Sequence, residues 1–159
     1  MDDLSTEEIA WLRLQRDKAT IRECIEYHFH GLDIGDIPGI HTRVYTPDVH
    51  ITPAHSAPFI GYPDERFQAV VAQFKASHHL PCTIEIEVDG DTARSLTFAI
   101  AFLRMANAEG GDSVVVRGQR YDHTWRRTGP EWRSDRLVQR ALWQYEAPAV
   151  DPHLPTLTD

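Results

Sequence analysis

Residues 83–105 read TIEIEVDGDTARSLTFAIAFLRM, and this segment carries the clearest structural pattern in the chain. Apolar and polar residues alternate from Thr83 to Val88, with the period of two that is typical of a half-buried β-strand. Asp89-Gly90 follows at once, a dipeptide that favours a tight hairpin turn, and residues 92–105 are mostly apolar. The segment therefore predicts two long antiparallel strands joined by a short turn.

The rest of the chain extends this sheet and places helices before it. Two more strands are predicted at residues 114–127 and 132–145, joined by a turn. Before the hairpin, Ser5 and Glu8 form a capping box for a helix that should end near residues 31–35. The other elements expected are a short helix or turn at residues 36–39, a strand at 44–51, and a helix that begins near Pro63 and carries Phe67, Val70, Val71 and Phe74 on one face.

This order of elements predicts an α+β fold, in which helices pack on one face of a curved antiparallel sheet. Long strands that curl around an N-terminal helix enclose a cone, and the mouth of such a cone is a natural pocket for a small molecule. The chain has 159 residues, about the length of one domain. We expect this domain to span residues 1–146 and a proline-rich tail to occupy residues 147–159.

Composition narrows the classes of function. The chain has 16 Lys and Arg against 24 Asp and Glu, a net charge of −8, which argues against sequence-independent binding of nucleic acid. No apolar run approaches the ~20 residues that cross a bilayer, and the acidic N-terminus lacks the pattern of a secretory signal. Cys24 and Cys82 make no disulfide framework, so we expect reduced thiols and a cytoplasmic protein.

Among nine histidines, His28 is the first candidate for a functional role. It shares a helical face with Ile21, Ile25 and Leu32, so its imidazole should point toward the interior. Two interpretations are open: a buried histidine bonded to the backbone, or a donor or proton shuttle that lines a pocket. Asp33 follows at the end of the same helix, where an aspartate is usually a cap or turn former.

His78 and His79 are expected to end the helix that begins near Pro63 and to precede the first long strand. The helix dipole alone would favour them there. Adjacent residues entering a strand point to opposite sides, so only one of the two can face the concave side of the sheet. If that histidine met Asp33, the carboxylate would fix the tautomer of the imidazole and make the other ring nitrogen a base.

Tyr121, His123 and Trp125 share one face of the third long strand by the period of two. On the concave side they would form an aromatic floor for a flat, partly apolar ligand, whereas on the convex side they could cover a subunit interface. Arg136 is expected on the same face of the last strand as Trp132. If it points inward it could bind an anion or a carbonyl oxygen; if outward, it is a solvated rim residue.

Metal binding is the main chemical alternative in a histidine-rich chain. His28 and His30 lie two apart on a helix and point roughly 200° away from each other, so they cannot chelate one ion. No His-Glu-x-x-His or Cys-x-x-Cys spacing occurs, and neither a phosphate-binding glycine loop nor a Gly-x-Ser-x-Gly elbow is present. The sequence therefore predicts no metal site.

Taken in order, several segments resemble the SnoaL-like, scytalone dehydratase-like branch of the nuclear transport factor 2-like superfamily. The resemblance extends from about Lys18 to Tyr145. The segments that carry it are residues 21–33 with Gly35-Asp36, residues 79–83 leading into 84–93, residues 118–122, and Trp132-Arg133. It implies a cone closed by helices, a homodimer or homotrimer, and an enzyme without metal or organic cofactor.

The resemblance also implies roles for particular residues. In the elimination enzymes of this family, an aspartate at the end of the first helix orients a histidine that precedes the first long strand, and Asp33 and His79 match these positions. His28 stands where another donor often lies. Thr83 replaces a frequent asparagine, and Leu137 takes the place of an arginine found in some members, with Arg136 one residue before it. A shift of one residue moves a strand side chain to the other face, so Arg136 would need a bulge to reach the pocket.

These observations lead to the hypothesis of a lyase of the dehydratase type, or an isomerase, acting on a small hydroxylated ring compound. His79, held by Asp33, would be the base and His28 the proton donor. Tyr121, His123, Trp125, Arg136 and Thr83 would contact the substrate. The alternative is a non-catalytic module of the same fold that binds a small molecule or another subunit, since a fold alone does not define a function.

Overall fold

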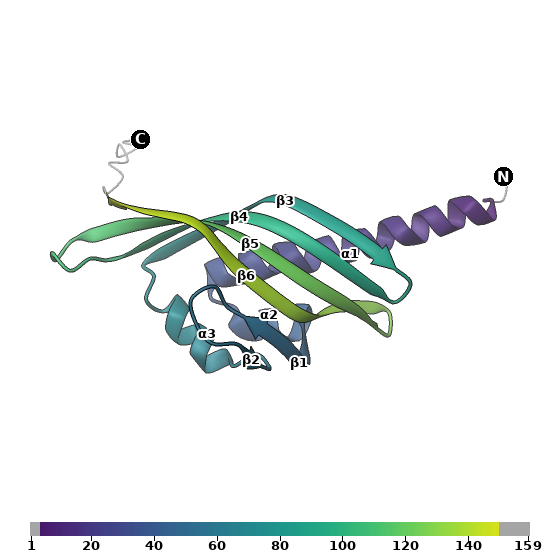
Figure 1. Ribbon diagram of the computed structural model, residues 1–159, viewed down its shortest axis with the longest axis horizontal. Helices are drawn as coiled ribbons and strands as arrows, with labels where there is room; N and C mark the ends of the chain where they lie inside the picture. Colours follow the sequence, from purple (N-terminus) through teal and green to yellow (C-terminus); the bar gives the residue numbers. More distant parts are fainter. Residues whose placement is uncertain (1–3, 150–159) are drawn as a thin grey trace, which may run out of the picture.

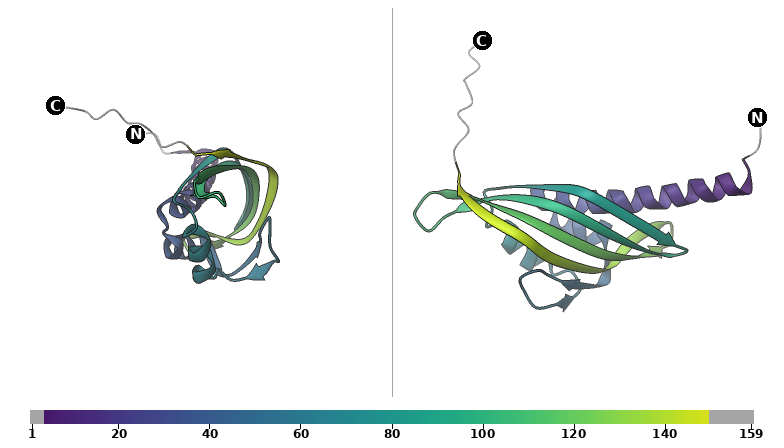
Figure 2. Two further views of the ribbon diagram at one scale, coloured as in Figure 1. Left: turned by 90° about the vertical axis from the view of Figure 1, so that its left-hand side faces the viewer. Right: turned by 45° about the horizontal axis from the view of Figure 1, so that its top comes forward.

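A computed structural model describes residues 4–149, and it confirms the predicted α+β architecture. The elements in chain order are α1 (Thr6–Ile34), α2 (Ile37–Val44), β1 (Tyr45–Thr52), β2 (Phe59–Ile60), α3 (Asp64–Val71), β3 (Ala76–Asp89), β4 (Thr92–Ala106), β5 (Asp112–Thr128) and β6 (Glu131–Pro148). The four long strands lie in front of α1 in Figure 1. Seen end-on, they curl into an incomplete barrel with the helices on its concave side (Figure 2, left).

The sheet has six strands in the order β2-β1-β6-β5-β4-β3. The long strands β3 to β6 pair antiparallel in sequence order, as predicted. The short strand β1 pairs parallel to β6, because α1 and α2 carry the chain back to that edge before β1 begins. The sequence analysis gave neither this parallel pairing nor the two-residue strand β2.

Capping residues determine where helix α1 begins and ends. Ser5 accepts a hydrogen bond from the backbone of Glu8, and the Glu8 side chain accepts one from the backbone of Ser5, so the predicted capping box is present. The helix ends at Gly35, which adopts the left-handed conformation at φ 74°. The N-terminal half of α1 extends beyond the sheet (Figures 1 and 2), while its C-terminal half lies against the concave face.

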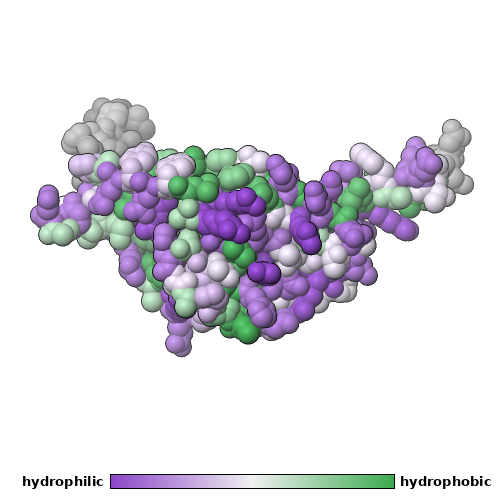
Figure 3. Space-filling model, in the orientation of Figure 1, coloured by the Kyte–Doolittle hydropathy of each residue, from purple (hydrophilic) through white to green (hydrophobic). Residues whose placement is uncertain are grey.

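The core lies between α1 and the concave face of the sheet. Ile21, Ile25 and Phe29 of α1 are fully or almost fully buried against Trp125 and Trp132 of the long strands. Their spacing of three to four residues is the helical period that the sequence shows. Among residues 4–149, no helix combines the length and hydrophobicity needed to cross a membrane. The surface seen in Figure 3 is largely hydrophilic, with hydrophobic side chains in scattered groups.

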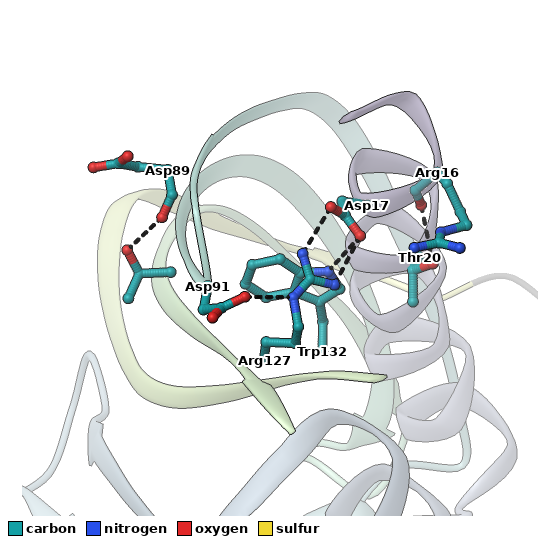
Figure 4. A network of polar contacts seen from close by, with 8 residues as sticks. Arg16, Asp17, Thr20, Asp89, Asp91, Arg127 and Trp132 are labelled. Atoms are coloured by element: carbon teal, nitrogen blue, oxygen red, sulfur yellow. Dashed lines mark hydrogen bonds and ion pairs between the residues drawn. The ribbon is translucent and has the colours of Figure 1, made fainter. Parts of the chain in front are cut away.

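A polar network fastens α1 to the narrow end of the cone (Figure 4). Arg127 of β5 makes a two-pronged contact with Asp17, at 3.0 Å and 2.8 Å, and donates a third hydrogen bond to Asp91 of the β3–β4 turn. Trp132 donates its indole N–H to the same Asp17 carboxylate, and the Arg127 guanidinium lies 4.5 Å from its ring centroid. The network closes the end of the cone opposite its mouth, so that a cavity can remain open at the other end.

Three local features differ from the prediction. His78 and His79 lie inside β3, which begins at Ala76, and do not end a helix. Strand β6 continues to Pro148, so the first two residues of the expected tail belong to the strand. Residues 150–159 of that tail lie outside the described residues.

Candidate active site

The side chains of Asp33 and His79 are in direct contact. Asp33 Oδ1 lies 2.6 Å from His79 Nδ1, and Asp33 Oδ2 accepts the backbone N–H of His79 at 2.8 Å. Ser77, two residues earlier on the same face of β3, donates its hydroxyl to Oδ1 at 2.9 Å. An ionised carboxylate can only accept hydrogen bonds, so Nδ1 carries the hydrogen and Nε2 is the unprotonated nitrogen of a neutral His79.

The surroundings of Asp33 favour its charged form. Burial raises the pKa of this carboxyl, but the backbone and side-chain hydrogen bonds from His79, together with the bond from Ser77, outweigh burial and leave the pKa below its usual value. The His79 side chain is only 8% exposed, and its ring stacks on Phe29 at 6.0 Å. His78 is mostly exposed, with 68% of its side chain accessible, although its Nδ1 still lies 4.0 Å from Asp33 Oδ2. Of the two adjacent histidines, only His79 lines the cavity described below.

A cavity of about 340 Å³ opens beside His79 at the mouth of the cone. Its walls come from α1, α3, the loop after β1 and the concave face of β3 to β6. The apolar part of the wall is formed by Leu32, Pro53, Ala54, Phe59, Phe67, Val70, Val71, Phe74, Ala101 and Leu103, and the polar part by His28, His55, Ser56, Arg66, Ser77, His79, Arg117, Gln119, Tyr121 and Gln139. This mixture suits a small, partly apolar ligand.

His28 lines this cavity from α1 and is 2% exposed. Its Nδ1 lies 3.1 Å from the hydroxyl of Tyr45, and its Nε2 has no hydrogen-bond partner among the described residues. Burial, with smaller contributions from His123 and His79, holds the pKa of His28 well below its ordinary value, so the ring is neutral. When Tyr45 donates to Nδ1, the hydrogen of His28 lies on Nε2, where it can be donated to a ligand.

The aromatic face of β5 is concave, but only one of its three residues reaches the cavity. Tyr121 lines the wall and donates its hydroxyl to Gln119 at 2.6 Å. His123 and Trp125 lie deeper in the core, 2% and 1% exposed, and are not part of the wall. Burial lowers the pKa of His123 to about 3, so this ring is a neutral core residue. Of the three, only Tyr121 lines the cavity, so contact with a ligand stays a prediction for Tyr121 alone.

Thr83 and Arg136 face away from the cavity, contrary to expectation. An irregularity between Pro81 and Thr83 shifts the register of β3, and from there Ile84, not Thr83, points inward. A second irregularity, opposite Thr124 and Trp125, falls between residues 134 and 136 of β6. Beyond it Leu137 is 2% exposed in the core, while Arg136 lies on the outer face. A bulge is present near Arg136, but it turns the next residue inward.

The sequence analysis missed several polar residues of the cavity wall. Gln119 and Arg117 lie two and four residues before Tyr121 on β5, so the period of two that selected Tyr121 also points to them. Ser77 could have been found by the same rule from His79. Arg66 lies on α3, and no pattern in the sequence shows that this helix covers the mouth of the cone.

Comparison with known proteins identifies the family. The model of the SnoaL-like domain matches residues 14–138. The chain belongs to this family. No group of three or more His, Cys, Asp or Glu side chains within residues 4–149 is arranged to hold a metal ion. No curated protein is significantly similar in sequence.

Solved structures share the fold at low sequence identity. A candidate scytalone dehydratase of Novosphingobium aromaticivorans aligns with a TM-score of 0.72 and 16% identity, covering 91% of this chain and 96% of the other. A type-3 hexachlorocyclohexane dehydrochlorinase of Novosphingobium barchaimii gives 0.75 and 15%, covering 91% and 99%. A nuclear transport factor 2-like protein of N. aromaticivorans gives 0.67 and 26%, covering 89% and 92%. These similarities confirm the nuclear transport factor 2-like fold.

Proposed function

We propose that this SnoaL-like protein is a lyase of the dehydratase type, or an isomerase, that acts on a small hydroxylated ring compound without a cofactor. The observation that carries the proposal is the 2.6 Å contact of Asp33 with His79 Nδ1, made beside a cavity that the His79 ring lines. Asp33 orients the ring and stabilises the imidazolium that forms when Nε2 accepts a proton. A purely structural histidine would not need to line the cavity.

The chemistry divides between His79 and His28. His79 Nε2 accepts a proton from the carbon next to a carbonyl or a leaving group, and the electron pair left on carbon forms the new double bond. In an elimination, His28 donates a hydrogen bond from Nε2–H to the departing hydroxyl, and the proton that His79 accepted passes to this hydroxyl, which leaves as water so that both rings end neutral. In an isomerisation, His79 returns its proton to a different carbon. Such acid–base catalysis contributes about 10²–10⁴-fold in rate.

A panel of hydroxylated cyclic ketones, incubated with the protein in buffer that contains EDTA and followed by mass spectrometry, tests the proposal. We expect loss of one water from at least one compound, or solvent deuterium in the recovered ring. His79→Gln should lower that rate at least about 10²-fold. His50→Gln is the matched control, because this exposed histidine of β1 is not part of the cavity wall. Full activity of His79→Gln contradicts the proposal, and tight binding without any conversion supports the non-catalytic alternative.

We also propose that the protein forms a homodimer or homotrimer through the outer face of the sheet. Leu80, Phe102, Trp143 and Tyr145 are large apolar residues on this face, between 36% and 56% exposed. The strand registers place them in two neighbouring rows across β3 to β6. A Cβ on Gly118 would come within 2.2 Å of Trp143, so the glycine lets the indole lie against the strand. A group of exposed apolar side chains such as this outer apolar patch is typical of a subunit interface.

A further inference from the structure

The charge of the cavity wall is opposite to the charge of the whole protein. The chain has a net charge of −8, yet the residues that line the cavity include Arg66, Arg117 and three histidines and no aspartate or glutamate. The carboxylate of Asp33 lies behind His79 and is not part of the wall. A cavity that excludes carboxylates from its own wall can accept one from a ligand without repulsion at short range.

Neither arginine of the wall has an acidic partner among the described residues. Arg117 donates its Nε–H to Gln144 at 2.8 Å, and Arg66 donates one Nη2 hydrogen to Ser56 at 2.8 Å. These bonds to neutral groups orient the guanidinium planes without neutralising them. Asp64, which precedes Arg66 on α3, makes its ion pair with His41 at 3.1 Å.

The two arginines lie toward the open end of the cavity together with the exposed His55, and His28 and His79 lie deeper. Arg66 is exposed on α3 and Arg117 is half-buried on β5, whereas His28 is 2% exposed and the His79 side chain 8%. Apolar residues such as Phe67 and Leu103 form the wall in the same cavity. A ligand that fits this arrangement has an apolar ring, a reactive carbon near the histidines and an anionic group toward the solvent.

We propose that the substrate carries a carboxylate, which Arg117 and Arg66 bind at the mouth of the cavity. The inference rests on the proposed function for the identity of the site but adds the charge of the substrate. A guanidinium matches a carboxylate with two parallel N–H donors, so the pair fixes the orientation of the ring as well as binding it. Arg117 contributes more than Arg66, because the exposed Arg66 is screened by water and salt.

Isothermal titration with 4-hydroxybenzoate and its methyl ester tests the charge requirement without any turnover. The two probes share the hydroxylated ring and differ in the anionic group. We expect the wild-type protein to bind the carboxylate at least about tenfold more tightly than the ester, the ratio that corresponds to one charge-assisted hydrogen bond. Added salt should weaken the carboxylate more than the ester. Equal binding of the two probes, or binding of neither, overturns the inference.

Variants of the cavity arginine Arg117 test which side chain binds the carboxylate of the probe. Arg117→Gln should weaken 4-hydroxybenzoate about tenfold and leave the ester unchanged, while Arg117→Lys should retain part of the preference. Arg94→Gln is the matched control, because it removes the same charge on the outer face of β4. An equal effect of Arg117→Gln on both probes, or an equal effect of Arg94→Gln, contradicts the proposal. His79→Gln should bind the carboxylate normally, so a failure of the proposed acid–base chemistry would not alter this result.

Discussion

Replacing Asp33 by Asn tests the electrostatics of the candidate site through the stability of the fold. The carboxylate accepts three hydrogen bonds, from Ser77, from His79 Nδ1 and from the His79 backbone. An amide keeps one accepting oxygen and turns the other into a donor, so one or two of these bonds are lost. Hydrogen bonds to a charged group contribute about 1.5–3 kcal/mol each, and relief from burying the charge offsets part of the loss. We expect Asp33→Asn to lower the free energy of unfolding by about 1.5–3 kcal/mol at pH 7.

The contribution of Asp33 to the free energy of unfolding depends on pH in a direction that follows from its pKa shift. Because the pKa of Asp33 is lower in the folded protein than in the unfolded chain, its stabilisation is fully present above the unfolded value near 4 and is lost as the pH falls through the folded value. The difference in unfolding free energy between wild type and Asp33→Asn should therefore be present at pH 5 and above and shrink as the pH falls below about 4. Urea unfolding followed by circular dichroism at each pH measures it.

A matched control shows whether the loss of stability is specific to position 33 or follows any change of aspartate to asparagine. Asp89 lies exposed at the end of β3, and its side chain has no hydrogen-bond partner among the described residues. Asp89→Asn should change the free energy of unfolding by less than about 0.5 kcal/mol at every pH. A loss for Asp33→Asn that is equally small, or that persists undiminished at pH 3, would contradict stabilisation of the fold by the ionised Asp33.

Two further predictions concern the ends of the sheet and its outer face. Arg127→Met removes the partner that holds the pKa of Asp17 below its usual value and leaves that carboxylate with only the indole of Trp132. Thermal unfolding should show that the free energy of unfolding falls by about 2–4 kcal/mol. A decrease below about 1 kcal/mol would contradict a role in closing the cone. Trp143→Lys places a charge in the outer apolar patch. Light scattering should therefore show an oligomer for the wild type and a monomer for the variant. A monomeric wild type, or a variant with the same oligomeric state as the wild type, would contradict the proposed interface.

Much of the fold could be predicted because its signals are local. The capping box at Ser5 and Glu8, the Asp89-Gly90 turn and the alternation after Thr83 each fix a backbone geometry within a few residues. The strand period of two correctly placed Tyr121, His123 and Trp125 on one face, but it left open whether that face is the concave one. The parallel pairing of β1 with β6 could not be predicted in this way, since it depends on how α2 returns the chain to the sheet.

The errors at Thr83 and Arg136 have one physical cause. A strand pattern assigns faces correctly only while the register is regular, and each bulge reverses the assignment for everything beyond it. The irregularity between Pro81 and Thr83 turned Thr83 outward, and the one near residue 135 did the same to Arg136. The alternation showed only that one of His78 and His79 could face inward, and the family resemblance selected His79 and paired it with Asp33.

The central claim is that His79 presents an unprotonated Nε2 beside the cavity while its Nδ1–H is donated to Asp33. Nitrogen NMR of the histidine rings at pH 8, where an ordinary imidazole is neutral, measures this tautomer directly. For His79, assigned by its loss in His79→Gln, we expect a protonated Nδ1 and an unprotonated Nε2, with the preference reduced in Asp33→Asn. A His79 signal with hydrogen on Nε2 and an unprotonated Nδ1 would contradict the proposed Asp33–His79 pair.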